Sequence, residues 1–185
     1  MVLSSEIEEI EMIQLVFAHC GYYFGSKDGM PWPHISQDFK NFKARTEGST
    51  LVMGAKTFST LPGILPGRKH VVVYDPVRGR PKAKDGSEAH QYVSINGFEQ
   101  ILRNNEFNDK VISVIGGAQI LELALPFAKK VIKTKIKVHP LDLKDVTQFL
   151  TSNFLNDIEK YRASESHCYI INPTTTVTEE IILRG

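Results

Sequence analysis

Cysteine is scarce in this sequence: 185 residues include only two, Cys20 and Cys168, far apart in the chain. A chain of this length does not need disulfides to fold, so we expect both thiols to be reduced, as is usual in the cytosol. A disulfide between them remains the alternative. The cysteine usage therefore argues against a small secreted scaffold held together by disulfides.

The sequence also lacks an excess of charge and a long apolar run. Lys and Arg total 22 and Asp and Glu total 21, so there is no general attraction to nucleic acid or to anionic membranes. The N-terminal stretch MVLSSEIEEIEM is acidic and has neither the basic nor the long apolar region of a signal peptide. We therefore expect a cytoplasmic protein with no nucleic-acid partner and no membrane insertion.

Apolar residues, by contrast, are plentiful at 42% of the chain, enough for the core of a single domain. Short β-branched runs alternate with helical patterns, which is typical of an α/β sheet with crossover helices. Strands are predicted at residues 13–20, 50–55, 70–75 and 111–117. Helices are predicted at residues 36–45, 56–61, 97–104 and 118–125.

The pattern changes after Pro126. Residues 129–138 form a strand pattern with alternating lysines, and residues 166–185 predict two strands about an Asn-Pro turn. Residues 75–86, rich in Pro, Gly and basic side chains, predict an exposed loop. The fold prediction is therefore α/β, a single domain with a central, mostly parallel β-sheet flanked by helices and a C-terminal antiparallel edge.

One predicted helix carries an acid on its apolar side. Ile35, Phe39 and Phe42 have the spacing of one helical face. Asp38 lies three residues after Ile35 and four before Phe42, so its carboxylate should point along that face. The alternative is local: Ser36 caps the helix, and the dipole favours an acid in the first turn.

Two strand-to-helix junctions could hold a phosphate. In VISVIGGAQILELAL, Gly116 and Gly117 allow close backbone approach at a helix start, although the full G-x-G-x-x-G pattern is absent. In LVMGAKTFSTL, Lys56 and Thr57 begin a helix, where a basic residue opposes the dipole unless an anion lies nearby. A plain turn and a solvated lysine are the alternatives.

Arg68 in LPGRKH follows a Pro-Gly turn and precedes an apolar strand. A guanidinium can hold a carboxylate through two parallel hydrogen bonds. An ordinary surface arginine is the other reading of this residue.

Taken in order, these motifs resemble dihydrofolate reductase over roughly Met12 to Tyr169. The resemblance rests on Met30-Pro31-Trp32, Asp38, Phe42, Met53-Gly54, Thr57, Leu65-Pro66-Gly67-Arg68 and Ile115-Gly116-Gly117. The stretches NFKARTEG, MGAKTF, LPGRKHVVV and SVIGGAQILELALP look particularly like the enzymes of large tailed bacteriophages. We accordingly expect an N-terminal acidic extension at residues 1–11 and a dihydrofolate reductase domain at residues 12–185.

The resemblance implies a substrate pocket in which Asp38 is the only ionisable side chain and hydrogen-bonds the pterin amidine together with Thr134. Met30 and Trp32 would complete the catalytic group, in a mobile loop that closes over the nicotinamide. The remaining substrate-binding residues implied are Phe39, Phe42, Leu61, Leu65, Arg68 and Ile115.

The same resemblance implies NADPH as cofactor, no metal, and a cis peptide between Gly116 and Gly117. Tyr74 and Asp75 depart from the family pattern, because an acid near the ribose favours a free 2′-hydroxyl. Lys56, with Arg78 and Arg80, would compensate. The implied cofactor-binding residues are Ala18, Gly25, Met30, Gly54, Lys56, Thr57, Tyr74, Asp75, Ile115, Gly116, Gly117, Ala118, Gln119 and Ile120.

The implied activity is hydride transfer from NADPH to 7,8-dihydrofolate, with protonation at N5. The product, tetrahydrofolate, serves one-carbon metabolism and thymidylate synthesis, and we expect a monomer or homodimer. Two alternatives stay open. One is a pyrimidine reductase of riboflavin synthesis, which shares the fold and cofactor; the other is a phage structural protein that binds folate without turnover.

Overall fold

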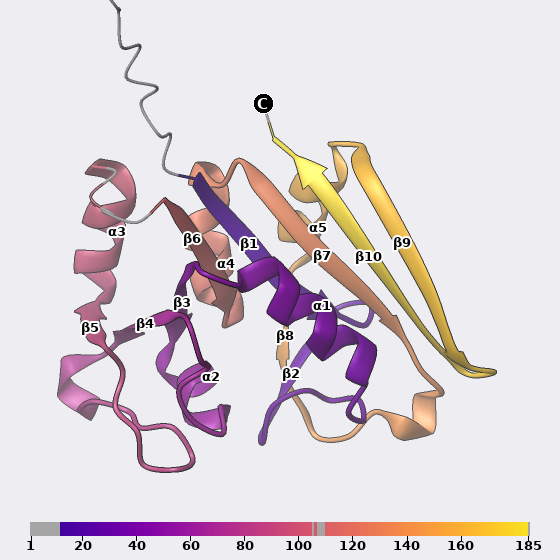
Figure 1. Ribbon diagram of the computed structural model, residues 1–185, viewed down its shortest axis with the longest axis horizontal. Coiled ribbons are helices and arrows are strands. Elements are labelled where there is room, and N and C mark those ends of the chain that lie inside the picture. The colour runs from indigo at the N-terminus through magenta and orange to yellow at the C-terminus, as the bar shows by residue number, and fades with distance from the viewer. Residues whose placement is uncertain (1–11, 105, 107–109, 185) are drawn as a thin grey trace, which may run out of the picture.

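An eight-stranded sheet forms the centre of the computed structural model, which describes residues 12–104, 106 and 110–184 (Figure 1). The predicted acidic extension lies outside the described residues. The strands of this sheet are β1 (Met12–His19), β3 (Thr50–Gly54), β4 (Lys69–Tyr74), β5 (Gln91–Ser94), β6 (Val111–Gly116), β7 (Lys130–Lys137), β9 (Ala163–Asn172) and β10 (Thr175–Leu183).

The strand order is β5-β4-β3-β6-β1-β7-β10-β9. All pairings from β5 to β7 are parallel, whereas β10 runs antiparallel to both β7 and β9. Continuous apolar runs suit the central strands because both faces of a parallel sheet are covered, and Leu51, Val52 and Met53 of β3 are all fully buried. The predicted parallel sheet with an antiparallel edge is confirmed.

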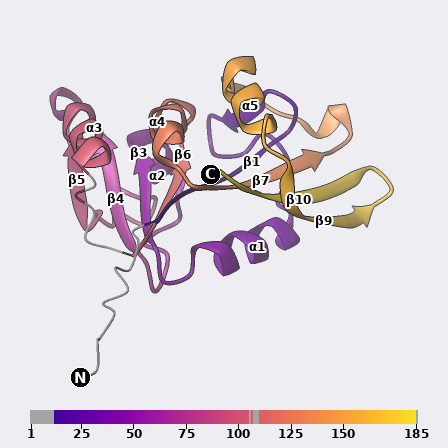
Figure 2. The same cartoon turned by 90° about the horizontal axis from the view of Figure 1, so that it is seen from above.

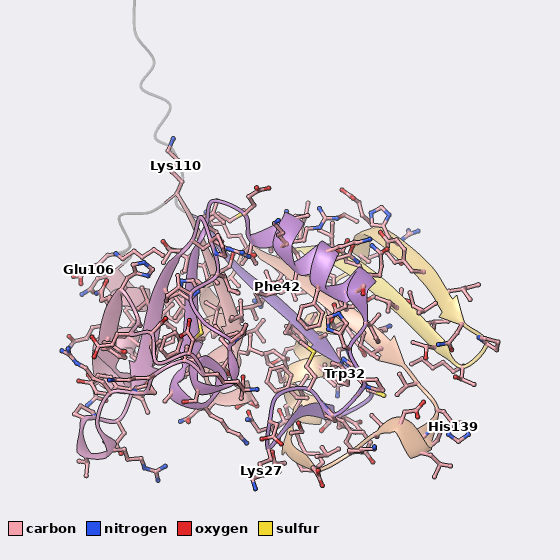
Figure 3. All side chains as sticks on the ribbon, turned by 60° about the horizontal axis from the view of Figure 1, so that its bottom comes forward. Lys27, Trp32, Phe42, Glu106, Lys110 and His139 are labelled. Atoms are coloured by element: carbon pink, nitrogen blue, oxygen red, sulfur yellow. The ribbon has the colours of Figure 1, made fainter. Side chains whose placement is uncertain are left out.

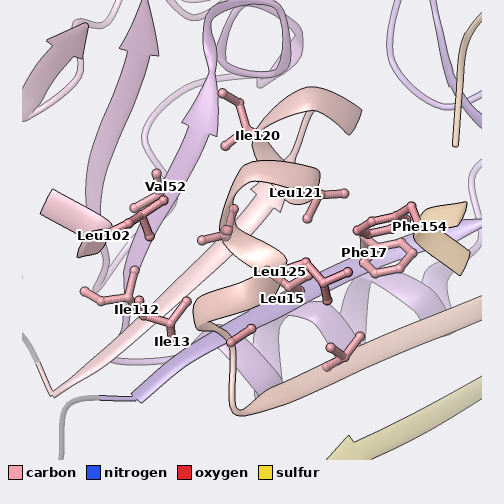
Figure 4. Close-up of a cluster of buried hydrophobic side chains, with 14 of the residues drawn as sticks. Ile13, Leu15, Phe17, Val52, Leu102, Ile112, Ile120, Leu121, Leu125 and Phe154 are labelled. Carbon is pink, nitrogen blue, oxygen red and sulfur yellow. The ribbon is translucent and has the colours of Figure 1, made fainter. Parts of the chain in front are cut away.

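Helices cover both faces of the sheet (Figure 2). They are α1 (Ser36–Thr46), α2 (Ala55–Thr60), α3 (Ile95–Asn104), α4 (Ala118–Ala124) and α5 (Ser152–Glu159), with short 3-10 turns at η1 (Pro76–Arg78), η2 (Leu125–Phe127) and η3 (Pro140–Asp142). On one face, Leu15 and Phe17 of β1 share a core with Leu102 of α3, Leu121 of α4 and Phe154 of α5 (Figure 4).

The opposite face of the sheet is covered by α1 and α2. Phe58 of α2 is fully buried against Val16 and Met53, and Phe42 of α1 packs on the same cluster. Because successive strand residues alternate between faces, β1 contributes to both cores. The functional site lies on this second face.

A second, two-stranded sheet was not predicted. It joins β2 (Tyr23–Ser26) to β8 (Val146–Phe149), and the rings of Tyr23 and Phe149 meet at 5.9 Å. Both rings are substantially exposed. The two strands therefore lack the regular alternation of apolar and polar residues by which a strand is recognised in a sequence. The prediction also omitted β5 and α5.

Two local predictions need correction. Ser36 does not cap α1: it is the first helical residue, and Ile35 occupies the N-cap position without a side-chain hydrogen bond. Loop 75–86 is largely exposed, but Ala83 is buried and the Lys84 amide donates to the Leu61 carbonyl at 2.9 Å. This loop is therefore docked beside α2.

Cys20 and Cys168 are both free thiols. None of the described helices is long and apolar enough to cross a bilayer.

Candidate active site

A cavity of about 640 Å³ opens between α1, α2 and the β1, β6, β7 and β10 strands. A single continuous space of this size is enough for a drug-sized ligand. Among the predicted site residues, those that line it are Ala18, Gly25, Met30, Trp32, Asp38, Phe39, Phe42, Lys56, Thr57, Leu61, Leu65, Arg68, Ile115 and Thr134.

Asp38 projects from the first turn of α1 into this cavity and is only 6% exposed. Its carboxylate receives no hydrogen bond from the part of the chain that the structure describes. Burial is the main reason that the pKa of Asp38 is raised from 3.8 to about 6, and the charge of Glu179 adds to the increase. The acid is thus available to a ligand and able to exchange a proton near neutral pH.

Thr134 lies on β7, 5% exposed, beside the same cavity. Its cross-strand partner on β10 is Glu179, which is 2% exposed and also lines the cavity. The expectation that Asp38 is the only ionisable side chain here is therefore wrong.

Glu179 and its partner Arg45 were both missed from the sequence. Arg45 donates to the Glu179 carboxylate through Nη2 at 2.8 Å and through Nε at 3.3 Å. A signal was present in TVTEEIILRG, where Val177, Glu179 and Ile181 alternate on one side of β10 and all three are buried. An acid on the inward side of a strand needs a partner or a function.

Arg68 also lies at the cavity, is 9% exposed, and is held by two hydrogen bonds to the protein. Its Nε donates to the Pro66 carbonyl at 3.1 Å and its Nη1 to Thr46 Oγ1 at 3.0 Å. Burial lowers the pKa of Arg68. The guanidinium is consequently fixed in direction rather than free at the surface.

The loop before α1 forms another wall. Trp32 is buried with Ile35 against Ile136 and Val177, whereas Met30 is 45% exposed. In Figure 3, Phe42 lies next to α1, Trp32 lies below that helix toward the loop, and Lys27 marks the tip of the loop. The loop thus presents a buried anchor beside an exposed side chain.

The diglycine turn after β6 adjoins the cavity. The Gly116-Gly117 peptide is cis, as the resemblance implied. A Cβ on Gly116 would lie 3.0 Å from Phe24 Cζ, and one on Gly117 would lie 2.9 Å from Gln148 Oε1. A larger residue at either position would fit only if the Phe24 or Gln148 side chain moved. The two glycines therefore leave the backbone at the start of α4 uncovered by side chains.

Other predicted cofactor residues lie outside the cavity lining. Gly54 packs against the diglycine turn, and Ile120 is buried in the core. Asp75 accepts from the Val77 amide at 3.0 Å, and its neighbour Tyr74 packs on Tyr92. The full group outside the lining is Gly54, Tyr74, Asp75, Gly116, Gly117, Ala118, Gln119 and Ile120.

Lys56 lines the cavity on α2, and its Nζ donates to Thr147 Oγ1 of β8 at 3.0 Å. Thr57 lies beside Gly116, with Oγ1 3.5 Å from the position of a Cβ on that glycine. Among the described residues, no three His, Cys, Asp or Glu side chains are grouped as metal ligands.

Comparison with known proteins gives consistent matches. The family described as dihydrofolate reductase matches residues 12–169. The chain is 33% identical over 116 residues to dihydrofolate reductase type 9 of Escherichia coli, covering 62% of this chain and 64% of that protein. It is 32% identical over 126 residues to the dihydrofolate reductase of Bacillus subtilis, covering 68% and 69% of the two chains.

The match to the type 9 protein thus spans less than two thirds of that relative. Among solved structures, a dihydrofolate reductase from Enterococcus faecalis, complexed with NADP(H) and RAB-propyl, superposes with a TM-score of 0.72. The superposition covers 94% of this chain and 96% of that one at 19% identity, so it supports the fold.

Proposed function

The chain belongs to the dihydrofolate reductase family, and from that premise we propose that it reduces 7,8-dihydrofolate to 5,6,7,8-tetrahydrofolate with NADPH. The observation that carries the proposal is the Asp38 carboxylate, buried in a largely apolar cavity without a hydrogen-bond donor from the described chain. An ionisable group in such a setting is typical of a ligand-binding site.

Asp38 accepts hydrogen bonds from the pterin amidine and so fixes and polarises the ring, with Thr134 beside it. Phe42 and Leu61 pack on the ring, and Arg68 binds the glutamate α-carboxylate. Met30 and Trp32 limit the access of bulk water to N5, and a water molecule beside them delivers the proton that N5 takes up. These roles orient the substrate and stabilise charge, which is the contribution that a protein makes to cofactor chemistry.

The residues at the diglycine turn fit the pyrophosphate of NADPH. Gly116 and Gly117 leave the backbone open where any Cβ would be obstructed, and Lys56 and Thr57 lie nearby. When bound, NADPH supplies the hydride. The Asp75 carboxylate accepts from the Val77 amide and lies 3.9 Å from Arg78 Nε, so a cation lies beside the acid that would otherwise oppose a 2′-phosphate, which supports NADPH over NADH.

The test is NADPH absorbance with and without dihydrofolate. Oxidation that depends on dihydrofolate, and falls strongly in Asp38→Asn, is expected. Oxidation with a ribosylamino-pyrimidine only would indicate the riboflavin-type reductase, and folate binding without oxidation would indicate a binding protein; either result rejects the proposal.

Several finer properties belong to the same proposal. We propose that the product supplies one-carbon metabolism, that the protein acts in the cytoplasm as a monomer or homodimer, and that it binds no nucleic acid. We also propose that the chain is related to the enzymes of large tailed bacteriophages. The stretches NFKARTEG, MGAKTF, LPGRKHVVV and SVIGGAQILELALP support this relationship.

A further inference from the structure

The Arg45 and Glu179 ion pair crosses the wall of the cavity between α1 and β10. The Arg45 side chain is 31% exposed, whereas that of Glu179 is 3% exposed. The carboxylate therefore stands on the inner side, bound through both of its oxygens by the guanidinium. Two charge-assisted hydrogen bonds in fork geometry fix the position of the carboxylate.

The register of β10 directs Glu179 to the cavity and its neighbour away from it. Glu179 pairs with Thr134 on β7. Glu180, the next residue, faces the other side of the sheet, where its carboxylate lies 3.0 Å from Lys135 Nζ and 3.7 Å from Lys133 Nζ. The two adjacent glutamates thus have separate surroundings, and only Glu179 shares the cavity with Asp38.

The charge of Glu179 acts on Asp38. Desolvation is the larger cause of the raised pKa of Asp38, and repulsion by Glu179 is the second. The other charged or titratable side chains lining the cavity come from the loop before α1, from α1, from α2 and from the turn before β4: Asp28, His34, Lys43, Arg45, Lys56 and Arg68. None of these appears among the causes of the Asp38 shift.

We propose that Glu179, held by Arg45, is a positioning residue of the substrate pocket that adds a fixed negative charge beside Asp38 and so influences which ligand group Asp38 binds. A fixed negative charge beside Asp38 favours a proton or a cationic ligand group between the two acids. Glu179 thereby biases the pocket toward basic rings that bind as cations over neutral rings of the same shape. The inference rests on the proposed function only in taking Asp38 as the ligand-binding acid.

Direct titration of Asp38 tests the proposal without turnover. The carboxyl carbon of Asp38 is followed by carbon-13 NMR in the ligand-free protein, with Asp38→Asn identifying its resonance. In Glu179→Gln the midpoint should fall by about half a pH unit or more, which is roughly a threefold change in proton affinity. An unchanged or higher midpoint overturns the proposal.

The double variant Arg45→Gln/Glu179→Gln covers the case in which an unpaired Arg45 prevents folding. It removes both charges and leaves amides that can hydrogen-bond, and the Asp38 midpoint should again fall. Glu180→Gln is the matched control, because it neutralises the adjacent glutamate on the other face and should leave the midpoint unchanged. A fall of equal size in Glu180→Gln would show a nonspecific effect and reject the proposal.

Ligand preference supplies an independent measurement. The affinity ratio of 2,4-diaminopyrimidine to its neutral 2-amino-4-oxo counterpart, measured at neutral pH, should fall about threefold in Glu179→Gln. An unchanged ratio rejects the bias toward basic rings. If the wild-type protein fails to oxidise NADPH with dihydrofolate while the Asp38 midpoint still shifts, the proposed function fails and the role of Glu179 stands.

Discussion

The Nε2 atom of His70 accepts a hydrogen bond from the backbone amide of Leu65 at 3.1 Å. A backbone N–H can only donate, so the proton of the neutral ring is on Nδ1, which lies 3.0 Å from the Arg68 carbonyl and donates to it. His70 is fully buried. This imidazole therefore ties together both ends of the turn that carries Leu65 and Arg68 to the cavity.

Acidification should weaken the fold through His70. Burial, the largest cause, lowers its pKa below 6.5, so its contribution to stability is complete above that value and is lost as the pH falls toward the folded pKa. We expect the free energy of unfolding to drop less between about pH 7.5 and about pH 5.5 in His70→Asn than in the wild type, because Asn does not titrate. Urea titrations measure this; equal drops in both proteins would contradict it.

Arg68→Leu should raise the KM for dihydrofolate. The lost contact to the substrate carboxylate is worth on the order of 2 kcal/mol, while the KM for NADPH should change little. Thr46→Val removes the hydroxyl that accepts from Arg68 Nη1 and should raise the same KM by a smaller factor. Steady-state kinetics with each substrate varied test this, and an unchanged dihydrofolate KM in Arg68→Leu would remove the residue from the site.

Lys56→Ala should weaken the binding of NADPH much more than the binding of NADH if the Lys56 ammonium contacts the 2′-phosphate. The variant also loses the hydrogen bond to Thr147, so Thr147→Val serves as the control for that contact. Equal weakening of both cofactors would place Lys56 at the pyrophosphate or at the surface. A wild-type preference for NADH would show that Asp75 determines the selectivity.

Asp38→Asn should lower kcat/KM for dihydrofolate by roughly 10² or more at neutral pH, the scale of acid-base assistance. The loss should diminish as the pH falls, because solution then protonates the substrate. Activity profiles across pH measure both effects. Near-native activity with an unchanged profile would leave Asp38 with only its favourable place in the first turn of α1.

The same substitution should stabilise the protein. The folded pKa of Asp38, about 6, lies above its unfolded value of 3.8, so its favourable contribution is present below 3.8 and is lost as the pH rises through 6. Above pH 6, burial of the charge costs up to about 3 kcal/mol, which Asn avoids. Unfolding free energies should favour the variant at neutral pH and converge in acid; a less stable variant at neutral pH would contradict this.

Local sequence patterns were enough to predict the central sheet and which side of α1 faces the interior. The β-branched runs at β3, β4 and β6 are long enough to indicate buried strands, and Asp38 points inward with Ile35 as its spacing required. Ser36 failed as a cap because the Ile35 side chain is buried against Trp32 and Val177. Tertiary packing there outweighed a local capping preference.

The elements and contacts that were not predicted from the sequence depend mainly on residues far apart in the chain. The pairing of β2 with β8 joins Gly25 to Gln148, and neither strand is apolar enough to be recognised alone. For α5 a signal existed, since Thr151 caps the helix by accepting from the Phe154 amide at 3.1 Å. The partner of Glu179 could not be read locally, because Arg45 lies 134 positions away.

The separation between Arg45 and Glu179 makes ligand binding a measure of complete folding. The cavity takes walls from β1, α1, α2, β6, β7, β8 and β10, so a partly folded chain lacking any of these elements has no intact site. A ligand bound only to the native state stabilises the whole molecule by mass action. Saturating ligand should therefore protect the loop before α1 and the last strand from proteolysis together, although no ligand need touch both.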